Sequence, residues 1–467
     1  MGHREDIDTT AALPSLPPIV HPLTADLVRR HRGLIADLVH GLGSTLHILL
    51  PQVFEATVAR FRGALTMAGV DGSILFAKKA NKARCFVERC AALGIGVDAA
   101  SAQEVEQALA CGVPGTHIGI TGPAKHDGLL QLALRQQCLV AIDSLDELQR
   151  FAALAARTGC RGRLLLRRLP ATQPHSRFGM SDGESAEALR LCLARRDVLL
   201  PEGFSFHLSG YSPQARAAEA DRLIDACIEA QRLGLTHCRT VNIGGGFAVR
   251  YVEEADWAAF AERQQAAHYH AGKTFSGFYP YYSASHGPGM LADILACRPE
   301  GAEATLAQRL KRHGLRLLLE PGRALLDHAG FTAFQVQGVK DRPADGYGIL
   351  TVGGTSFSMS EQWFESEFLP DPLLLDDAAA GAATDGYAAC VGGASCLDAD
   401  MVTWRKIRFP RRPRTGDVLL YLNTAGYQMD SNESPFHDLP LPPKVVVSVE
   451  REVPRWRLDS RGGVAAF

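Results

Sequence analysis

The chain carries eight short apolar runs, each followed by Gly, Asp or Ser and then by a stretch with helical spacing. Several runs are continuous in Val, Ile and Leu, which is typical of parallel strands buried on both faces. Eight strand and helix units predict an α/β fold, a (β/α)8 (TIM) barrel, with a doubly wound open sheet as the alternative. The expected strands are Ile74–Lys79, Ile95–Asp98, His117–Thr121, Cys138–Asp143, Arg163–Arg168, Gly203–Leu208, Arg239–Ile243 and Leu315–Glu320.

The segment before the barrel has a different pattern. The first 18 residues are polar and end in LPSLPP, so we expect a loosely held tail there. A helical pattern follows from Thr24 to about His40, then a strand at Thr45–Leu50. We interpret residues 1–50 as a tail, a helix and a strand that joins a later β domain.

The segment after the barrel is rich in β-type runs broken by turn residues. We therefore expect a barrel over residues 51–328 and a C-terminal, barrel-like β domain over 329–467. Within the latter, the Ala- and Asp-rich stretch Leu373–Asp385 predicts a mobile loop. The expected β segments are Thr332–Val339, Ile349–Val352, Val418–Leu422 and Val445–Val449.

An insertion near residues 250–312 separates the last two barrel strands. It contains an aromatic-rich stretch, His268–Met290. Loops that follow barrel strands line the active face, so this insertion could shape a pocket; an extra pair of surface helices is the alternative.

Composition excludes several classes of protein. The 49 basic and 51 acidic residues leave a net charge of −2, so nothing favours nucleic acid or an anionic membrane as a partner. No apolar run approaches the roughly 20 residues that span a bilayer, and the acidic N-terminus is unlike a signal peptide. The 11 cysteines form no C-x-x-C pair, so we expect a reduced, cytoplasmic chain without a metal site.

Polar residues gather where the predicted strands end. Barrel enzymes place their catalytic groups at these carboxyl ends, and a purely structural barrel does not need such a set there. The distribution therefore indicates an enzyme. The residues are Lys79, Asp98, Thr121, Asp143, Arg167, His207, Gly244, Gly245, Gly246 and Glu320.

Four of these positions together suggest one cofactor. The glycine run lets backbone N–H groups approach a phosphate, and a lysine that ends a buried strand (Lys79, with Lys78 and Lys82 as competitors) can form a Schiff base. A buried carboxylate at Glu320 needs a cation, either Arg323 or a protonated pyridine nitrogen. His207 could lie flat on such a ring. These are the groups that pyridoxal 5'-phosphate requires.

The motifs resemble those of the alanine-racemase-type (fold type III) decarboxylases, the group of diaminopimelate, ornithine and arginine decarboxylases. FAKKAN, GVDAAS (Gly96–Ser101), SRFGM (Ser176–Met180), GGGF (Gly244–Phe247) and EPGR (Glu320–Arg323) match the family in order and spacing. The resemblance selects Lys79 as the Schiff-base lysine, places Gly322 and Arg323 at the cofactor and makes Arg323 a candidate ligand of the substrate carboxylate.

The resemblance extends into the β domain. GGASCLDAD resembles the family's G-x-x-C-x-x-x-D. This match implies that Cys396 is supplied across a homodimer interface and acts as the proton donor in the partner's site, and that Asp400 lies near the substrate. TAGYQ makes Tyr427 the phosphate-binding tyrosine, and PFHDLP places His437 where the family has Asn. The resemblance thus implies an obligate homodimer with shared active sites.

Two positions depart from the family pattern in ways that bear on ligand binding. The phosphate-binding hydroxyl is displaced by one residue, to Ser209, and Leu397 replaces an acidic residue that helps recognise a distal amino group. Asp398 follows one position later and could compensate. The resemblance implies α-decarboxylation of an amino acid, as in diaminopimelate and ornithine decarboxylases; the alternatives are a racemase on the same fold, against which Glu320 argues, and a non-catalytic pyridoxal phosphate-binding homologue.

Overall fold

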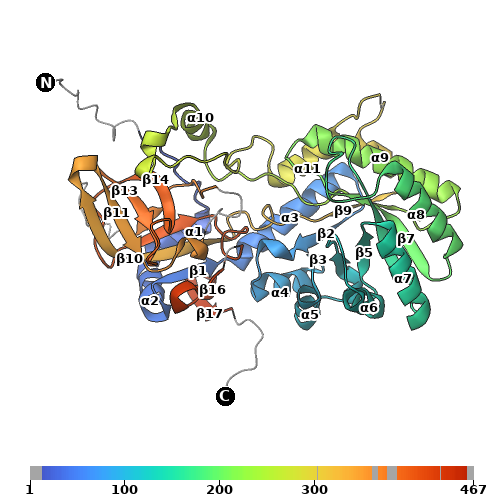
Figure 1. The fold of residues 1–467 in the computed structure, drawn as a ribbon, viewed down its shortest axis with the longest axis horizontal. Helices are drawn as coiled ribbons and strands as arrows, with labels where there is room; N and C mark the ends of the chain where they lie inside the picture. The colour runs from blue at the N-terminus through green and yellow to red at the C-terminus, as the bar shows by residue number, and fades with distance from the viewer. Residues whose placement is uncertain (1–12, 302, 360–365, 376–385, 432, 460–467) are drawn as a thin grey trace, which may run out of the picture. The chain divides into compact units, whose positions relative to one another are not determined.

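The computed structural model describes residues 13–301, 303–359, 366–375, 386–431 and 433–459 (Figure 1). Contacts divide the chain into two compact units. The described residues of the barrel unit lie within Phe54–Ala248 and Ser285–Leu325. Those of the β unit lie within Met1–Val53, Val249–Ala284 and Leu326–Asp459.

The barrel unit contains a closed barrel of eight parallel strands, which confirms the predicted barrel and excludes the open sheet. The sequence differs from the structure at some strand ends. The first strand stops at Ala77, and Lys78–Ala80 forms a 3-10 turn. The sixth begins at Leu199 and stops at Phe206, just before His207. The strands are β2 (Gly72–Ala77), β3 (Gly96–Ala99), β4 (Ile118–Ile120), β5 (Leu139–Ile142), β6 (Gly162–Arg168), β7 (Leu199–Phe206), β8 (Thr240–Asn242) and β9 (Arg316–Leu319).

Helices lie outside these strands (Figure 1). Serine side chains at Ser101, Ser144 and Ser181 accept a backbone N–H from the first turn of the helix that follows, which fixes where each helix begins. The helices are α3 (Pro51–Ala68), whose first residues belong to the β unit, α4 (Arg84–Leu93), α5 (Ala102–Ala110), α6 (Asp127–Gln136), α7 (Leu145–Thr158), α8 (Asp182–Ala194), α9 (Pro213–Arg232), α11 (Gly287–Ala296) and α12 (Leu306–Arg312).

The β unit is built on one large sheet that includes an N-terminal strand. β1 (Thr45–Leu49) pairs antiparallel with β10 (Gly330–Arg342) and parallel with β16 (Lys444–Glu450), so the N-terminal strand does join the later β segments. The remaining elements are α1 (Pro22–Arg30), α2 (Arg32–Leu42), α10 (Glu254–Arg263), β11 (Tyr347–Val352), β12 (Leu373–Leu375), β13 (Tyr387–Gly392), β14 (Met401–Phe409), β15 (Val418–Leu422) and β17 (Val453–Leu458).

The expected loose tail is wrong for the part of it that the structure describes. Leu16 is fully buried and its N–H donates to the Asp371 carboxylate. The buried guanidinium of Arg405 donates to the carbonyl oxygen of Pro14 at 2.7 Å. The other expected mobile segment is wrong at Leu373–Leu375, which pairs with β15; its residues 376–385 lie outside the described residues.

The insertion does contain helices, since α10, α11 and α12 lie within residues 250–312, but its aromatic-rich part is mostly irregular and has a role of its own. Residues 249–284 group by their contacts with the β unit. His270 stacks against Trp404 of β14 and its Nδ1 lies 2.8 Å from the Tyr347 hydroxyl. The Tyr281 hydroxyl donates to the Glu367 carbonyl oxygen. Most of this stretch therefore stabilises the β unit, a role that its position between two barrel strands does not indicate.

Candidate active site

Lys79 and Asp98 meet at the carboxyl ends of β2 and β3. The Lys79 ammonium lies 4.0 Å from the Asp98 carboxylate, which also accepts a hydrogen bond from the Thr121 hydroxyl after β4. Lys78 points elsewhere: it is buried, and it lines a separate cavity of the barrel unit together with Lys82. Lys79 is thus paired with a carboxylate at the barrel mouth.

The electrostatics of this pair depend on a second acid. Burial, followed by the nearby Glu320 carboxylate, raises the pKa of Asp98 to about 7, although Lys79 and the Thr121 hydrogen bond oppose the shift. Such a perturbed carboxyl group beside a lysine and a second carboxylate is typical of a functional site.

The glycine run after β8 is locked to Glu320 through Asn242. The Asn242 side-chain amide donates to the Glu320 carboxylate at 2.6 Å, while its Oδ1 accepts the Gly244 N–H at 2.9 Å. The Glu320 N–H in turn donates to the Gly244 carbonyl oxygen. A Cβ on Gly245 would lie 2.6 Å from the Glu320 carbonyl oxygen, so the close approach of the two loops requires glycine there.

Arg216 of α9 joins this turn to the loop after β7. Its guanidinium donates to the Ile243 carbonyl oxygen at 2.7 Å and to the carbonyl oxygens of Leu208 and Gly210 at 3.1 and 3.2 Å. Burial lowers the pKa of Arg216 to about 10, which leaves it charged at neutral pH. Gly246 has a positive φ of 73°, and a Cβ there would lie 2.3 Å from the guanidinium. The guanidinium of Arg216 therefore places a fixed positive charge next to the glycine turn.

His207 follows β7 at the same end of the barrel. Its ring lies 4.6 Å, centroid to centroid, from the ring of Phe178. Desolvation, and then the positive charges of Lys79 and Arg167, lower the pKa of His207 to about 4. The imidazole is therefore neutral at physiological pH.

The SRFGM segment docks on the end of β6. The Arg167 guanidinium donates to the Asp143 carboxylate and to the Thr121 carbonyl oxygen, and the same carboxylate accepts the Gly179 N–H. Phe178 of this segment reaches the ring of His207 as a consequence. Asp143 and Arg167 thus position other residues at this end of the barrel.

Ser209, Gly322 and Arg323 lie in two of these loops. Ser209 is exposed, and Gln173 binds its backbone N–H and carbonyl groups. Gly322 and Arg323 are buried directly after Glu320. All three belong to the barrel unit, as do Lys79 and His207.

The remaining predicted residues belong to the β unit. The exposed Cys396 thiol lies 3.2 Å from Nε2 of His437. Asp398 is exposed, and Tyr427 is half-buried with a left-handed backbone, φ 74°.

Asp400 differs from the expected substrate contact. It is buried, and its two carboxylate oxygens accept the N–H groups of Ser356 and Ser395 at 2.6 and 3.0 Å. A Cβ on Gly393 would lie 2.2 Å from this carboxylate. Asp400 therefore holds the Cys396 loop together, and its oxygens are already engaged.

Sequence reasoning missed Asn242 and Arg216 as site residues. Asn242 stands directly before the glycine run, in NIGGG, which is a usable signal for a residue that orients the turn. Arg216 gave no signal, because it lies in the first turn of a helix whose charged residues look solvated in the sequence.

Comparisons with known proteins identify the family. The sequence model of the pyridoxal-dependent decarboxylase, pyridoxal binding domain, matches residues 53–281. The uncharacterised protein y4yA of Sinorhizobium fredii is 36% identical over 441 residues, 94% of this chain and 95% of that protein. The chain belongs to the pyridoxal-dependent decarboxylase family. Its named relatives in this family include diaminopimelate decarboxylases, which are pyridoxal-dependent carboxy-lyases.

Further members of the decarboxylase family cover nearly the whole chain. The diaminopimelate decarboxylase of Bacillus methanolicus is 22% identical and covers 88% of this chain and 89% of its own length. The structure of diaminopimelate decarboxylase from Helicobacter pylori complexed with L-lysine superimposes with a TM-score of 0.70 at 17% identity, covering 91% of this chain and 95% of the other. This likeness confirms the fold, a barrel with a separate β domain.

Membership of the decarboxylase family implies pyridoxal 5'-phosphate, and the residues present fit it. Among the described residues, the N–H groups of Gly245 and Gly246 have no protein acceptor, and the turn that carries them has no side chains to block a phosphate. Of the described residues, none form a cluster suited to a metal ion, and none make a helix long and apolar enough to cross a membrane.

Proposed function

We propose that the chain decarboxylates the α-carboxylate of an amino acid with bound pyridoxal 5'-phosphate. The observation that carries this proposal is the Glu320 carboxylate, fixed by Asn242 beside the glycine turn and close enough to Asp98 and Lys79 to act on the same charges. A carboxylate at this point keeps a pyridine nitrogen protonated, whereas the family's racemases are expected to have an arginine there.

We propose a set of residues that hold the cofactor, supported by this geometry for Lys79 and the glycine turn and by the family resemblance for the others. We assign its covalent attachment to the Lys79 amine and its phosphate to the N–H groups of Gly245 and Gly246, with Ser209, Gly322, Arg323 and Tyr427 as further contacts. Arg216 adds a positive charge behind the turn without leaving its three carbonyl acceptors. When bound, the protonated pyridine ring accepts the electron pair that the departing carboxylate leaves at the α-carbon.

The other side chains control protons and water. Because His207 is neutral, its ring can stack on the cofactor without adding a charge that competes with the pyridinium. The ring of Phe178 lies against that of His207 and helps to fix its orientation. Cys396 Sγ, or the Lys79 amine released by the substrate, then delivers a proton to the α-carbon, and Arg323 binds a substrate carboxylate.

We further propose that the active unit is a homodimer in which Cys396 comes from the partner subunit. The exposure of this thiol and its contact with His437 support the proposal, because they leave Sγ accessible and oriented. The exposed Leu397 offers no charge to a distal ammonium group, so Asp398 is the remaining candidate for such a contact in this loop.

The test uses a mixture of amino acids labelled in the α-carboxyl carbon. Wild-type protein should release labelled CO2, and Lys79→Ala should abolish both this release and the visible-edge absorbance of the lysine-bound cofactor. Lys82→Ala, an exposed lysine three residues away, serves as the matched control and should keep both. Loss of optical activity without CO2 would identify a racemase, and cofactor binding without any turnover a non-catalytic homologue.

A further inference from the structure

A further cavity of the barrel unit lies at the amino-terminal ends of the strands, opposite to Lys79 and Glu320. It measures about 470 Å³ and its lining includes the first residues of strands β2, β3, β4, β5, β8 and β9. With a rise of about 3.3 Å per residue, the six residues of β2 separate the two ends of that strand by roughly 16 Å. This volume is in the range of small-molecule sites.

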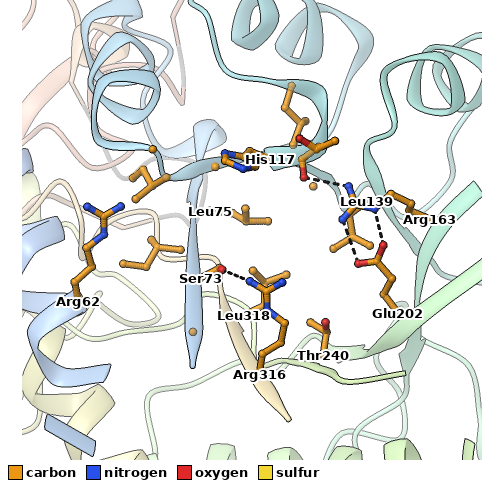
Figure 2. A pocket seen from close by; sticks show the side chains of 18 residues that line it. Arg62, Ser73, Leu75, His117, Leu139, Arg163, Glu202, Thr240, Arg316 and Leu318 are labelled. Atoms are coloured by element: carbon orange, nitrogen blue, oxygen red, sulfur yellow. Dashed lines mark hydrogen bonds and ion pairs between the residues drawn. The ribbon is translucent and has the colours of Figure 1, made fainter. Parts of the chain in front are cut away.

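The rim of this cavity is cationic. Its lining contains three arginines, Arg62, Arg163 and Arg316, and one carboxylate, Glu202 (Figure 2). Arg163 is fully engaged: it forms a two-pronged ion pair with Glu202 and donates to the carbonyl oxygens of Thr116 and Gln137. That pair cancels one positive charge and leaves two.

The two remaining guanidinium groups lack a counter-charge. Arg62 donates to the Leu93 carbonyl oxygen and Arg316 to the Ser73 hydroxyl, both neutral acceptors. Within the described part of the chain, neither arginine forms an ion pair. A ligand with two negative charges would therefore balance the rim.

The inner end of the cavity is apolar. Leu75, Leu139 and Leu318 line it and belong to the buried leucine cluster inside the barrel. Leu75 lies flat against two neighbouring strands because Gly96 and Gly119 leave room for it: a Cβ on either would come within 2.3 or 2.6 Å of its methyl groups. Leu75 thus forms part of the leucine floor, and Figure 2 shows the arginines arranged around it.

We propose that this N-terminal mouth binds a small aliphatic dicarboxylate. Its two carboxylates pair with Arg62 and Arg316, and its short methylene body rests on the leucine floor. Guanidinium groups suit carboxylates because they donate two parallel hydrogen bonds. The apolar floor distinguishes such a ligand from inorganic phosphate, which has the charge but no apolar body.

The experiment is calorimetric titration of the cofactor-loaded protein with glutarate as the probe. We expect one glutarate per chain, at least tenfold weaker binding of inorganic phosphate, and no heat from 1,5-diaminopentane, which has the opposite charge. Arg316→Gln and Arg62→Gln should each weaken glutarate binding at least tenfold. Arg62 is exposed on α3, so its replacement tests the proposal even if the Arg316 variant fails to fold.

The matched control is Arg232→Gln, an exposed arginine at the end of α9 and outside the cavity lining. It should bind glutarate like the wild type. Absence of glutarate binding, binding that both rim variants retain, or phosphate binding as tight as that of glutarate would each overturn the proposal.

Discussion

The Asn242 amide binds the Glu320 carboxylate at 2.6 Å and, through its other end, the Gly244 N–H at 2.9 Å. One side chain therefore couples two elements of the candidate site, the acid and the glycine turn. Because Asn242 ends β8 and Glu320 follows β9, the coupling depends on the pairing of these two strands. Loss of this amide should therefore disturb both the Glu320 carboxylate and the glycine turn.

Replacing Asn242 with Asp should reduce cofactor affinity and the rate of CO2 release more than replacing it with Ala. Ala removes a hydrogen bond to a charged group, worth about 1.5–3 kcal/mol, or roughly 10- to 150-fold. Asp has the same shape but sets a second carboxylate against Glu320, which adds repulsion. Cofactor binding followed by absorbance, with kcat measured in parallel, checks the order. An Asp variant as active as the Ala variant would contradict the assigned pairing.

Gly246→Ala should destabilise the protein by about 2 kcal/mol or more and weaken cofactor binding. The residue has a φ of 73°, which L side chains adopt at a cost, and the added methyl would lie 2.3 Å from Arg216. Gly183→Ala in α8 is the matched control, since no atom lies within 4 Å of the added carbon and its φ is not in the left-handed region. Urea unfolding should show a control that is unchanged or slightly stabilised.

Asp98 should contribute a fall in stability as the pH rises from about 4 to 7, opposite in sign to the contribution of His207, whose pKa is lowered to about 4. The folded-state pKa of Asp98 is raised to about 7, chiefly by burial, above an unfolded value of about 3.9. In this window the folded state holds a proton that the unfolded state has lost, so raising the pH favours unfolding, by up to about 4 kcal/mol. Above about pH 7 this contribution is constant.

Asp98→Asn should remove this contribution to the pH dependence of the free energy of unfolding. The measurement is urea unfolding of the cofactor-free protein between pH 4.5 and 8. In that form the Lys79 amine carries no cofactor and keeps its ion pair with Asp98. Glu187→Gln replaces an exposed carboxylate on α8 and should keep the wild-type slope. Equal slopes for wild type and Asp98→Asn would show that Asp98 is not the titrating group.

The sequence predicts the barrel well because its signal is local. Several of the buried parallel strands are continuous apolar runs, and several helices begin at a polar cap such as Ser101 or Ser144, so eight units can be counted without knowing how they pair. The strands of the β unit are harder to predict from the sequence. Its strands Tyr387–Gly392 and Val453–Leu458 are short and contain Gly or Pro, which weakens their β signal. The packing of 249–284 against that sheet has no local signal at all.

For the site, residue types at strand ends sufficed to bring Lys79, Asp98 and Glu320 together, because the carboxyl ends of barrel strands converge. Which of Lys78 and Lys79 faces the mouth needed either the family motif or the structure, since the 3-10 turn at Lys78–Ala80 breaks the strand alternation. The structural use of Asp400 could not be read from sequence, because its two N–H donors are set by the folded loop around Gly393.

Two inactive variants should restore activity when they share a dimer. If Cys396 completes the site of the partner subunit, a mixed dimer of Lys79→Ala and Cys396→Ala contains one site with both mutations and one with neither. Co-expression in equal amounts makes half of the dimers mixed, so activity should return to about a quarter of the wild-type value. Sedimentation should show that each variant alone is dimeric but inactive in CO2 release. Co-expression without recovery would place Cys396 in the site of its own chain, whereas a fully active Cys396→Ala protein would leave Lys79 as the proton donor.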